Sequence, residues 1–279
     1  MLTEWGILLK KSGEVLLEIS SKDNQKIKYA VRLKQKSFRK QETCFLIEGR
    51  NMMEEALKHP KLLRQIFVEP KFADEYIELS QQHPEWECYM VDERLMKHIS
   101  DTENPPGIVA VCQIPSWSGV DFGSKNAFLV FLDHIADPGN LGTIIRSGWA
   151  LGADGILLSP DSVDPFNPKV VRASMGGIFN IPVLLDFPVD GLKCLKQNGY
   201  KIFCTSLQAR TEMFSLDFTG PSVLTIGSES QGVRNVIEKI CDSSFKIPIK
   251  PEVDSLNAAV ACAIIMHEAW KQRQGFTLS

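Results

Sequence analysis

The sequence lacks the features that mark several large classes of protein. No apolar run approaches the roughly 20 residues that a membrane-spanning helix needs. The first five residues, with an early acid at Glu4, lack the basic-then-apolar order of a secretory signal. The seven cysteines are odd in number, scattered and without a C-x-x-C pair, which argues against a disulfide framework and a zinc site. These absences predict reduced thiols, no membrane partner and a cytoplasmic location.

Signatures of common cofactors are missing as well. The five histidines show no H-E-x-x-H spacing, so no ligand set for a catalytic metal is visible and we expect no metal. There is no G-x-G-x-x-G, and no lysine follows the glycine-rich turns as it does in a P-loop. The sequence therefore gives no indication that the protein binds dinucleotides or nucleoside triphosphates.

Positive charge is concentrated near the N-terminus. The net charge of −3 gives no support to nucleic-acid binding, but between Lys22 and Lys40 the single acid is Asp23. Clustered basic side chains can neutralise phosphates, although a solvated helix face explains such a run equally well. We call residues 22–40 the basic segment. Its candidate contacts to a nucleic acid are Lys28, Arg32, Lys34, Lys36, Arg39 and Lys40.

Two domains are expected from 279 residues, of which 44% are hydrophobic. Residues 115–125 are rich in turn formers and have no period, which predicts a linker between domains at 1–114 and 126–279. The first domain alternates helix and strand signals, as in a small α/β/α layer. Its expected helices are 24–36, one through 52–57, 72–82 and 93–99 (with Asp92 as N-cap), and its strands are 44–48, 65–68, 87–91 and 107–113.

The second domain has strands of another kind, because they are almost wholly apolar. Strands buried on both faces have this composition, so we expect an α/β domain with a mostly parallel sheet covered by helices. Its expected strands are 127–132, 155–158, 201–205 and 223–226.

One segment of the second domain joins an apolar strand to a helix through a polar turn that ends at Asn140. Gly142 and Arg146 follow four residues apart and so share one helix face. An ordinary strand-to-helix corner leaves Gly142 unexplained, since glycine in a helix costs about 1 kcal/mol relative to alanine. The pattern favours a close approach at Gly142, with Arg146 projecting one turn further on.

Two later segments also place polar residues beside apolar ones. A glycine-rich loop holding Glu229 follows the strand 223–226, although a plain turn would explain it equally well. Further on, Asp254 or Ser255 is expected to cap a helix that runs to about Trp270. A capped, buried helix accounts for that segment except for Asn257, which is polar within an apolar turn and indicates a further role.

In this order and at these spacings, the segments resemble the three motifs of the SpoU/TrmH branch of the SPOUT methyltransferases. Residues 167–177 also resemble the family's stretch between its first two motifs, and 24–113 more weakly resemble its N-terminal RNA-binding domain, akin to a ribosomal-protein fold. One departure is Ser228, where the family commonly has asparagine; it puts contacts to the substrate in doubt. The matching residues are Asn140, Gly142 and Arg146; Gly227, Glu229 and Gly232; and Ile247-Pro248 with Ser255-Leu256-Asn257.

The resemblance implies a function and a fold. The function is transfer of a methyl group from S-adenosylmethionine to a ribose 2′-hydroxyl of structured RNA, with ribosomal RNA favoured. The fold has a trefoil knot near its C-terminal end, which general rules on chain threading disfavour. A homodimer is implied too. The backbones of Gly227, Ile247 and Leu256, with Thr205, are implied to hold the cofactor.

The implied catalytic residues are Arg146, Asn140, Glu229, Ser255 and Asn257. In the family the arginine is suggested to activate the 2′-hydroxyl. A guanidinium group has a pKa above about 12 and is a poor base. We therefore favour an Arg146 that orients the ribose and its neighbouring phosphate, with Glu229 and Asn140 holding it and the RNA, and with Ser255 and Asn257 shaping the pocket.

Other functions remain open from the sequence. An RNA-binding assembly factor of the same fold without activity is one, but it has no chemical need for Asn140, Arg146, Glu229 and Asn257 together. A methyltransferase acting on a base or a small molecule is another, and a small substrate would not need the basic segment. A dehydrogenase lacks its glycine fingerprint. The RNA and the nucleotide that are modified also stay open.

Overall fold

The computed structural model describes residues 6–9, 15–117, 120, 122, 126–228 and 231–275. By their internal contacts the residues form two compact units. Unit 1 comprises Met1–Ser116 and Phe166–Phe179, and unit 2 comprises Trp117–Pro165 and Asn180–Ser279. The segment Phe166–Phe179 thus belongs with the N-terminal residues, whereas the sequence suggests two contiguous domains.

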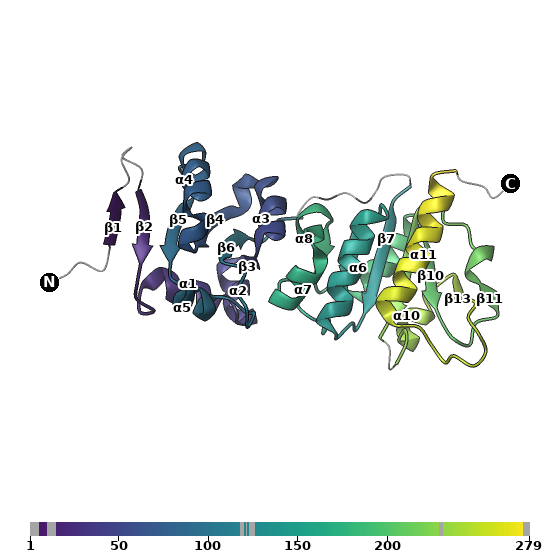
Figure 1. The fold of residues 1–279 in the computed structure, drawn as a ribbon. Helices are drawn as coiled ribbons and strands as arrows, with labels where there is room; N and C mark the ends of the chain where they lie inside the picture. Colours follow the sequence, from purple (N-terminus) through teal and green to yellow (C-terminus); the bar gives the residue numbers. More distant parts are fainter. Residues whose placement is uncertain are drawn as a thin grey trace. The chain divides into compact units, whose positions relative to one another are not determined.

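Unit 1 is built on a mixed six-stranded sheet in the order β1-β2-β5-β4-β6-β3 (Figure 1). β2, β5 and β4 pair in parallel, and the other pairings are antiparallel. The strands are β1 (Gly6–Leu9), β2 (Val15–Ile19), β3 (Cys44–Glu48), β4 (Leu63–Val68), β5 (Glu87–Val91) and β6 (Ile108–Gln113). Its α-helices include α1 (Gln25–Arg32), α2 (Lys36–Glu42), α3 (Arg50–Leu57), α4 (Ala73–Gln82), α5 (Glu93–Ile99) and, from the later segment, α7 (Pro168–Ser174).

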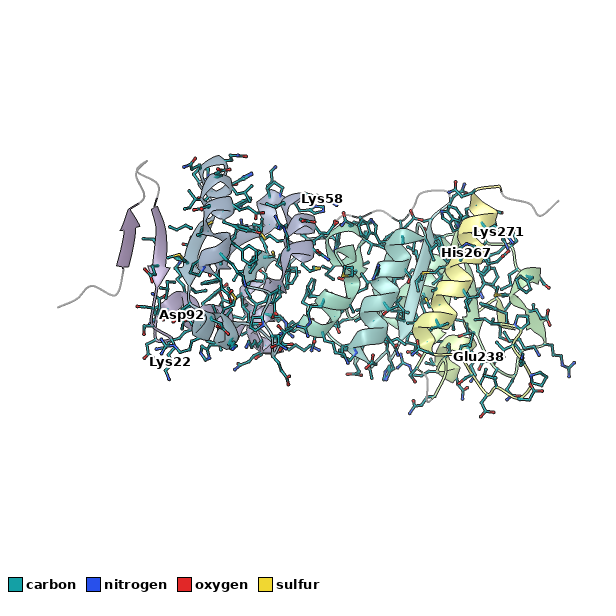
Figure 2. The ribbon with its side chains drawn as sticks, viewed as in Figure 1. Lys22, Lys58, Asp92, Glu238, His267 and Lys271 are labelled. Atoms are coloured by element: carbon teal, nitrogen blue, oxygen red, sulfur yellow. The ribbon has the colours of Figure 1, made fainter. Side chains whose placement is uncertain are left out.

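Alternate residues of these strands face different helices, as the two-residue period of a strand requires. Phe67 and Tyr89 pack with the apolar faces of α1, α2 and α5, whereas Cys88 and Met90 pack with α4. Helices therefore cover both faces of the sheet, which agrees with the layered arrangement expected from the sequence. The expected N-cap of α5 is confirmed, because the Asp92 side chain accepts a hydrogen bond from the Leu95 amide at 2.7 Å (Figure 2).

The structure corrects the expectation of one basic helix over 24–36. α1 ends at Arg32, and α2 begins at Lys36 after an extended Gln35. The Arg39 guanidinium donates hydrogen bonds from Nη1 to the carbonyls of Leu33 and Lys34, both at 2.8 Å. Carbonyls at the end of a helix lack partners within it, so Arg39 stabilises the corner between the two helices.

Unit 2 contains a seven-stranded sheet in the order β11-β13-β10-β12-β7-β8-β9, and every pairing in it is parallel. The strands are β7 (Phe128–Asp133), β8 (Gly155–Leu158), β9 (Val183–Leu184), β10 (Lys201–Thr205), β11 (Thr211–Glu212), β12 (Ser222–Gly227) and β13 (Ser243–Lys246). The helices assigned wholly to this unit are α6 (Pro138–Ala150), α9 (Val189–Gln197), α10 (Asn235–Glu238) and α11 (Ala258–Arg273).

Both faces of this sheet are covered. Leu129 and Phe131 of β7 pack with Leu192 of α9 and Ile237 of α10 on one face. On the other, α11 packs against α6 and β12 (Figure 1). Burying such apolar side chains completely stabilises a fold by about 1.5–3 kcal/mol each, so the apolar strands supply the core. The expected parallel sheet is confirmed. Within the described residues, no helix has the length and apolar character to cross a bilayer.

Candidate functional site

A cavity lies where neighbouring strands of unit 2 end. β13, β10 and β12 are adjacent and parallel, so their carboxyl ends meet at one edge of the sheet. The segments that follow them, together with the chain entering α11, enclose about 450 Å³. This volume lies within the range of about 300–1,000 Å³ typical of small-molecule sites, and open parallel sheets commonly bind ligands at this edge.

All four residues that the sequence suggests for cofactor binding line this cavity. Thr205 ends β10, Gly227 ends β12, Ile247 follows β13, and Leu256 lies two residues before α11. Ser255, suggested for the catalytic set, lines it as well. Segments separated by as many as 51 residues, from Thr205 to Leu256, thus reach one wall because their strands are neighbours.

Gly227 is required by the backbone around it. A Cβ at this position would lie 2.0 Å from the carbonyl carbon of Gly232 and 2.2 Å from the amide nitrogen of Val233. The loop folds back this closely because the Gly232 amide donates a hydrogen bond to the Ser228 carbonyl at 2.8 Å. The resemblance implies that the backbone of Gly227 holds the cofactor. The structure adds that the backbone of the loop occupies the space that a side chain at this position would need.

The cavity wall offers backbone groups with free hydrogen-bonding capacity. Neither Ile247 nor Leu256 forms a backbone hydrogen bond with another described residue. Both are partly buried and lie beside apolar side chains of the wall. Partly buried amide and carbonyl groups are stabilised when they acquire a partner. The wall is thus suited to a ligand that presents both donors and acceptors.

Two charged residues of the wall escaped the reasoning from sequence. Glu238 lies on α10 (Figure 2), and Lys246 ends β13. Neither forms an ion pair with another described residue. Neither residue belongs to one of the three motifs. Only the fold shows that both side chains line the cavity. The wall thus offers one carboxylate and one ammonium group.

The structure corrects the expected cap of the last helix. Asn257, and neither Asp254 nor Ser255, is the N-cap of α11, because its Oδ1 accepts hydrogen bonds from the amides of Ala259 and Val260 at 3.0 and 3.2 Å. Its Nδ2 donates to Asn140 Oδ1 at 2.9 Å. Two residues of the suggested catalytic set are therefore in contact, and they join the first turns of α6 and α11.

Arg146 lies on α6, six residues after Asn140, and its side chain is exposed. Six helical residues correspond to about 9 Å along the helix axis. Its side chain forms neither an ion pair nor a hydrogen bond with a described residue, and Arg146 is not part of the cavity wall. Glu229, the remaining member of the suggested catalytic set, lies outside the described residues.

An ion pair between a buried carboxylate and a partly exposed arginine joins the end of β7 to the loop after β12. Asp133 ends β7 and is fully buried, and its carboxylate accepts hydrogen bonds from the backbone amide and the Nε of Arg234 at 2.9 and 2.8 Å. Arg234 follows the glycine loop after β12. Breaking such a pair leaves a buried charge and costs about 3–5 kcal/mol. The pair was missed because its members are 101 residues apart, although an acid ending an apolar strand was a usable signal.

The basic segment is less uniform than its sequence suggests. Arg39 is 3% exposed and bonds the end of α1, as described above. Lys34 donates from Nζ to the carbonyls of His98 and Ser100 at 3.0 and 2.6 Å, and burial lowers its pKa. Both cations therefore stabilise unit 1. Arg39 is too deeply buried to contact RNA as expected, whereas Lys34 is partly exposed and stays a prediction. Lys28 pairs with Asp23 while remaining half exposed.

Three candidates remain accessible at the surface. Arg32 lies over the ring of Phe38, with 3.9 Å between its Cζ and the ring centroid. Lys36 and Lys40 are exposed on α2, four residues apart and so on one helix face. No ion pair joins either lysine to a described residue. Across the described residues, no group of three or more His, Cys, Asp or Glu side chains is arranged to hold a metal ion.

Comparison with protein families assigns the chain. Residues 127–267 match the model of the SpoU rRNA Methylase family. The chain belongs to the SpoU rRNA methylase family. Residues 24–110 match a second model, the MRM3-like substrate binding domain. The resemblance drawn from the three motifs is confirmed.

Named relatives and solved structures agree with the SpoU assignment. The 23S rRNA (guanosine(2553)-2′-O)-methyltransferase RlmP of Bacillus subtilis is 33% identical over 250 residues, covering 90% of this chain and 98% of that protein. The AdoMet-bound rRNA methyltransferase from Sinorhizobium meliloti has a TM-score of 0.82 at 29% identity, covering 94% and 98% of the two chains. The SpoU methyltransferase AviRb from Streptomyces viridochromogenes, in complex with AdoMet, has a TM-score of 0.80 at 28% identity, covering 90% and 98%.

Proposed function

We propose that this protein transfers a methyl group from S-adenosylmethionine to a ribose 2′-hydroxyl of ribosomal RNA. The observation that carries the proposal is the gathering of Thr205, Gly227, Ile247 and Leu256 around one cavity. The family match, and relatives named as ribosomal-RNA 2′-O-methyltransferases, support the reaction and its substrate.

The cavity suits this cofactor. S-adenosylmethionine joins a flat adenine to a ribose and to a cationic amino acid. The apolar lining from Ile226, Phe245 and Leu256 suits the adenine, and the backbone groups of Ile247 and Leu256 suit its edge. Glu238 and Lys246 offer opposite charges for the ammonium and carboxylate of the amino acid. The cofactor supplies a methyl group on an electrophilic sulfonium.

The protein's own contribution to the reaction is placement. An in-line displacement requires the ribose oxygen about 3 Å from the methyl carbon, with the oxygen–carbon bond forming as the carbon–sulfur bond breaks. We assign Arg146 to hold the ribose and its adjacent phosphate, because it is exposed and has no partner among the described residues. Asn257 and Asn140 fix the first turns of α11 and α6 relative to each other, and Arg146 lies further along α6. The hydroxyl proton leaves to water or to a phosphate oxygen.

Further parts of the proposal concern the assembly and its location. We propose a homodimer through α6 and α11, which are in contact with each other and expose Trp149 (39%) and Val260 (49%).

We also propose that the chain from β13 to α11 passes through the loop after β12 to form a trefoil knot; the two loops share one cavity wall. A cytoplasmic location is supported by seven free cysteines.

The proposal is tested with Arg146→Ala. The variant should bind S-adenosylmethionine like the wild type, because Arg146 is not part of the cavity wall. Transfer of a tritiated methyl group to unmodified ribosomal RNA should fall by about 10²–10³-fold, the effect of removing one donor that acts in the transition state. Lys193→Ala, which removes an exposed cation from α9 on the other face of the sheet, is the control and should leave both readouts unchanged. Wild-type protein without cofactor binding or transfer would refute the function.

A further inference from the structure

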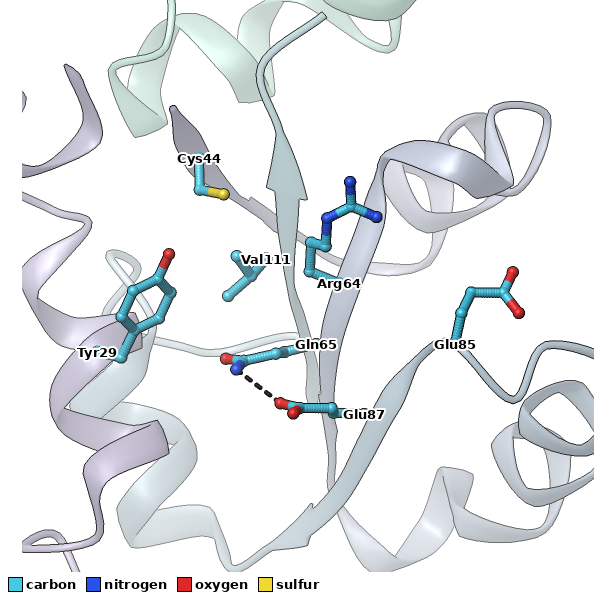
Figure 3. Close-up of a pocket in the computed structure, with 7 residues that line it drawn as sticks. All are labelled: Tyr29, Cys44, Arg64, Gln65, Glu85, Glu87 and Val111. Atoms are coloured by element: carbon cyan, nitrogen blue, oxygen red, sulfur yellow. Dashed lines mark hydrogen bonds between the residues drawn. The ribbon is translucent and has the colours of Figure 1, made fainter. Parts of the chain in front are cut away.

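A second cavity lies in unit 1, far along the chain from the cofactor residues. It encloses about 340 Å³ where β4 and β5 begin (Figure 3). Its floor is a row across three adjacent strands, because Val111 pairs with Gln65 and Gln65 pairs with Glu87. Its lining residues are Tyr29, Cys44, Arg64, Gln65, Glu85, Glu87 and Val111.

The carboxylate of Glu87 is fixed and charged. Lys26 Nζ donates to both of its oxygens, at 2.8 and 2.6 Å, and the Tyr89 hydroxyl donates to Oε2 at 3.0 Å. Burial alone would raise the pKa of Glu87, but hydrogen bonds from Lys26, Tyr89 and Gln65 outweigh it and lower the pKa. Glu87 is therefore ionised at neutral pH and can only accept hydrogen bonds.

The ionised Glu87 determines how the amide of Gln65 is oriented. Gln65 Nε2 donates to Glu87 Oε2 at 2.8 Å, and the reverse orientation would place the amide oxygen against a carboxylate (Figure 3). Gln65 Oε1 consequently points away from Glu87. This oxygen is buried and accepts no hydrogen bond from any described residue. A buried acceptor without a partner costs about 1–3 kcal/mol, so a ligand that presents an N–H group is favoured here.

An aromatic ring and a guanidinium group border the same space. Tyr29 of α1 is half-buried, and its ring is held by an edge-on contact with Phe38, with 5.5 Å between the centroids. Arg64, at the start of β4, is exposed and is held by the carbonyl of Lys61 at 3.0 Å and by Gln113 Oε1. A ring face, an acceptor for N–H and a nearby cation match a nucleobase with its phosphate.

We propose that this pocket binds the base of one unpaired RNA nucleotide, between the ring of Tyr29 and the amide oxygen of Gln65, with Arg64 near the phosphate. The inference rests on the proposed function, since it identifies the part of unit 1 that contacts substrate RNA. RNA is favoured over a free nucleotide because these residues lie within the match to a substrate binding domain. Single-stranded bases can also be splayed onto aromatic side chains.

The test measures binding of fluorescently labelled RNA octamers, A8 and C8, to the full-length protein by anisotropy. Tyr29→Leu should weaken binding by about 5- to 140-fold, as expected for the loss of one stacked base. Tyr29→Phe keeps the ring and should stay within about twofold of the wild type. Gln65→Met, similar in length but without the amide, should weaken binding by about 2- to 12-fold.

The matched control is Gln81→Met, the same substitution at an exposed position of α4, which packs on the opposite face of the sheet. Unchanged binding by Tyr29→Leu and Gln65→Met, with melting temperatures intact, would overturn the proposal. AMP that binds as tightly as A8, or wild-type protein that binds neither octamer, would overturn it as well. Cofactor calorimetry and methyl transfer to ribosomal RNA are read separately, so the proposed function can stand if the pocket fails.

Discussion

Gly227 stands where β12 ends, and the neighbouring backbone leaves it no room for a side chain. The loop after it turns back on itself, and Gly232 adopts a φ of +66° that favours glycine. Two glycines five residues apart thus fix the shape of one part of the cavity wall. The motif pattern locates this loop, but the distance from Gly227 to the backbone of Gly232 follows from the fold alone.

Gly227→Ala should therefore weaken cofactor binding, because even one added methyl group meets the backbone of the loop. A methyl group 2.0 Å from the Gly232 carbonyl carbon forces the loop to move, because backbone cannot yield as a flexible side chain does. Calorimetry with S-adenosylhomocysteine would show a loss of affinity of at least about tenfold, equivalent to about 1.4 kcal/mol. Gly220→Ala is the control, since nothing lies within 4 Å of its added Cβ. Equal affinity in both variants would show that this loop is not part of the cofactor site.

At the scale of elements, the bounds of the predicted strands agree better with the structure than the predicted helix ends do, although β1, β2, β9, β11 and β13 were not predicted. The apolar run 202–204 locates β10 (Lys201–Thr205), because the interior of a strand buried on both faces has no polar interruption. The start of α11 was misplaced because Asp254, Ser255 and Asn257 are all good caps. The choice depends on where the chain leaves the cavity loop, which is a tertiary feature. The break between α1 and α2 was also missed, since it depends on Arg39 turning inward.

Some cations of the basic segment form hydrogen bonds within unit 1, and others face solvent. Only the exposed cations should be substituted to test whether the segment binds RNA. Lys36→Glu combined with Lys40→Glu should reduce the slope of log affinity for RNA against log salt by about 1.4–1.8, at about 0.7–0.9 for each lost phosphate contact. Filter retention across a salt series provides the slope. The melting temperature should not fall, because both side chains are exposed. An unchanged slope would mean that this face of α2 is merely solvated.

Arg39→Ala is the contrasting variant in the same experiment. It leaves the carbonyls of Leu33 and Lys34 without the Nη1 donor they share, which costs about 2 kcal/mol or more because a charged donor is removed from a buried position. Stability should fall while the salt slope stays that of the wild type. The sequence could not separate Arg39 from Lys40, since adjacent cations in a charged run look alike until one of them is buried.

At the scale of the whole molecule, the two units do not follow the order of the chain. Phe166–Phe179 carries α7 (Pro168–Ser174) and, by sequence, lies inside the match to the SpoU methylase model. By its contacts it belongs to unit 1. Composition predicts a linker at 115–125, because a turn-rich stretch can be recognised from neighbouring residues alone. The assignment of the 14 residues Phe166–Phe179 to unit 1 depends on packing between residues far apart in the chain, and the sequence did not predict it.

The stability of unit 1 depends on the packing of Phe166–Phe179 against the N-terminal residues. Phe45 of β3 is fully buried, and the rings of Phe166 and Phe179 lie against it with centroid distances of 5.1 and 5.7 Å. Arg172 adds an ion pair with Asp101 at 3.2 Å. Losing two buried phenylalanines removes about 3–6 kcal/mol of hydrophobic stabilisation, a large part of the 5–15 kcal/mol typical of a domain.

A fragment of residues 1–116 should therefore be marginally folded, because it lacks this segment and leaves Phe45 uncovered. Thermal unfolding followed by circular dichroism should show a transition well below that of the same fragment with residues 166–180 attached through a glycine–serine linker. The shorter fragment should also bind a hydrophobic dye more strongly, since exposed apolar surface takes up such dyes. The linked fragment with Phe166→Ser and Phe179→Ser is the control for tethering alone and should behave like the shorter one. Equal melting of the short and linked fragments would show that Phe166–Phe179 contributes nothing to the stability of unit 1, and that its contacts with Phe45 form without stabilising it.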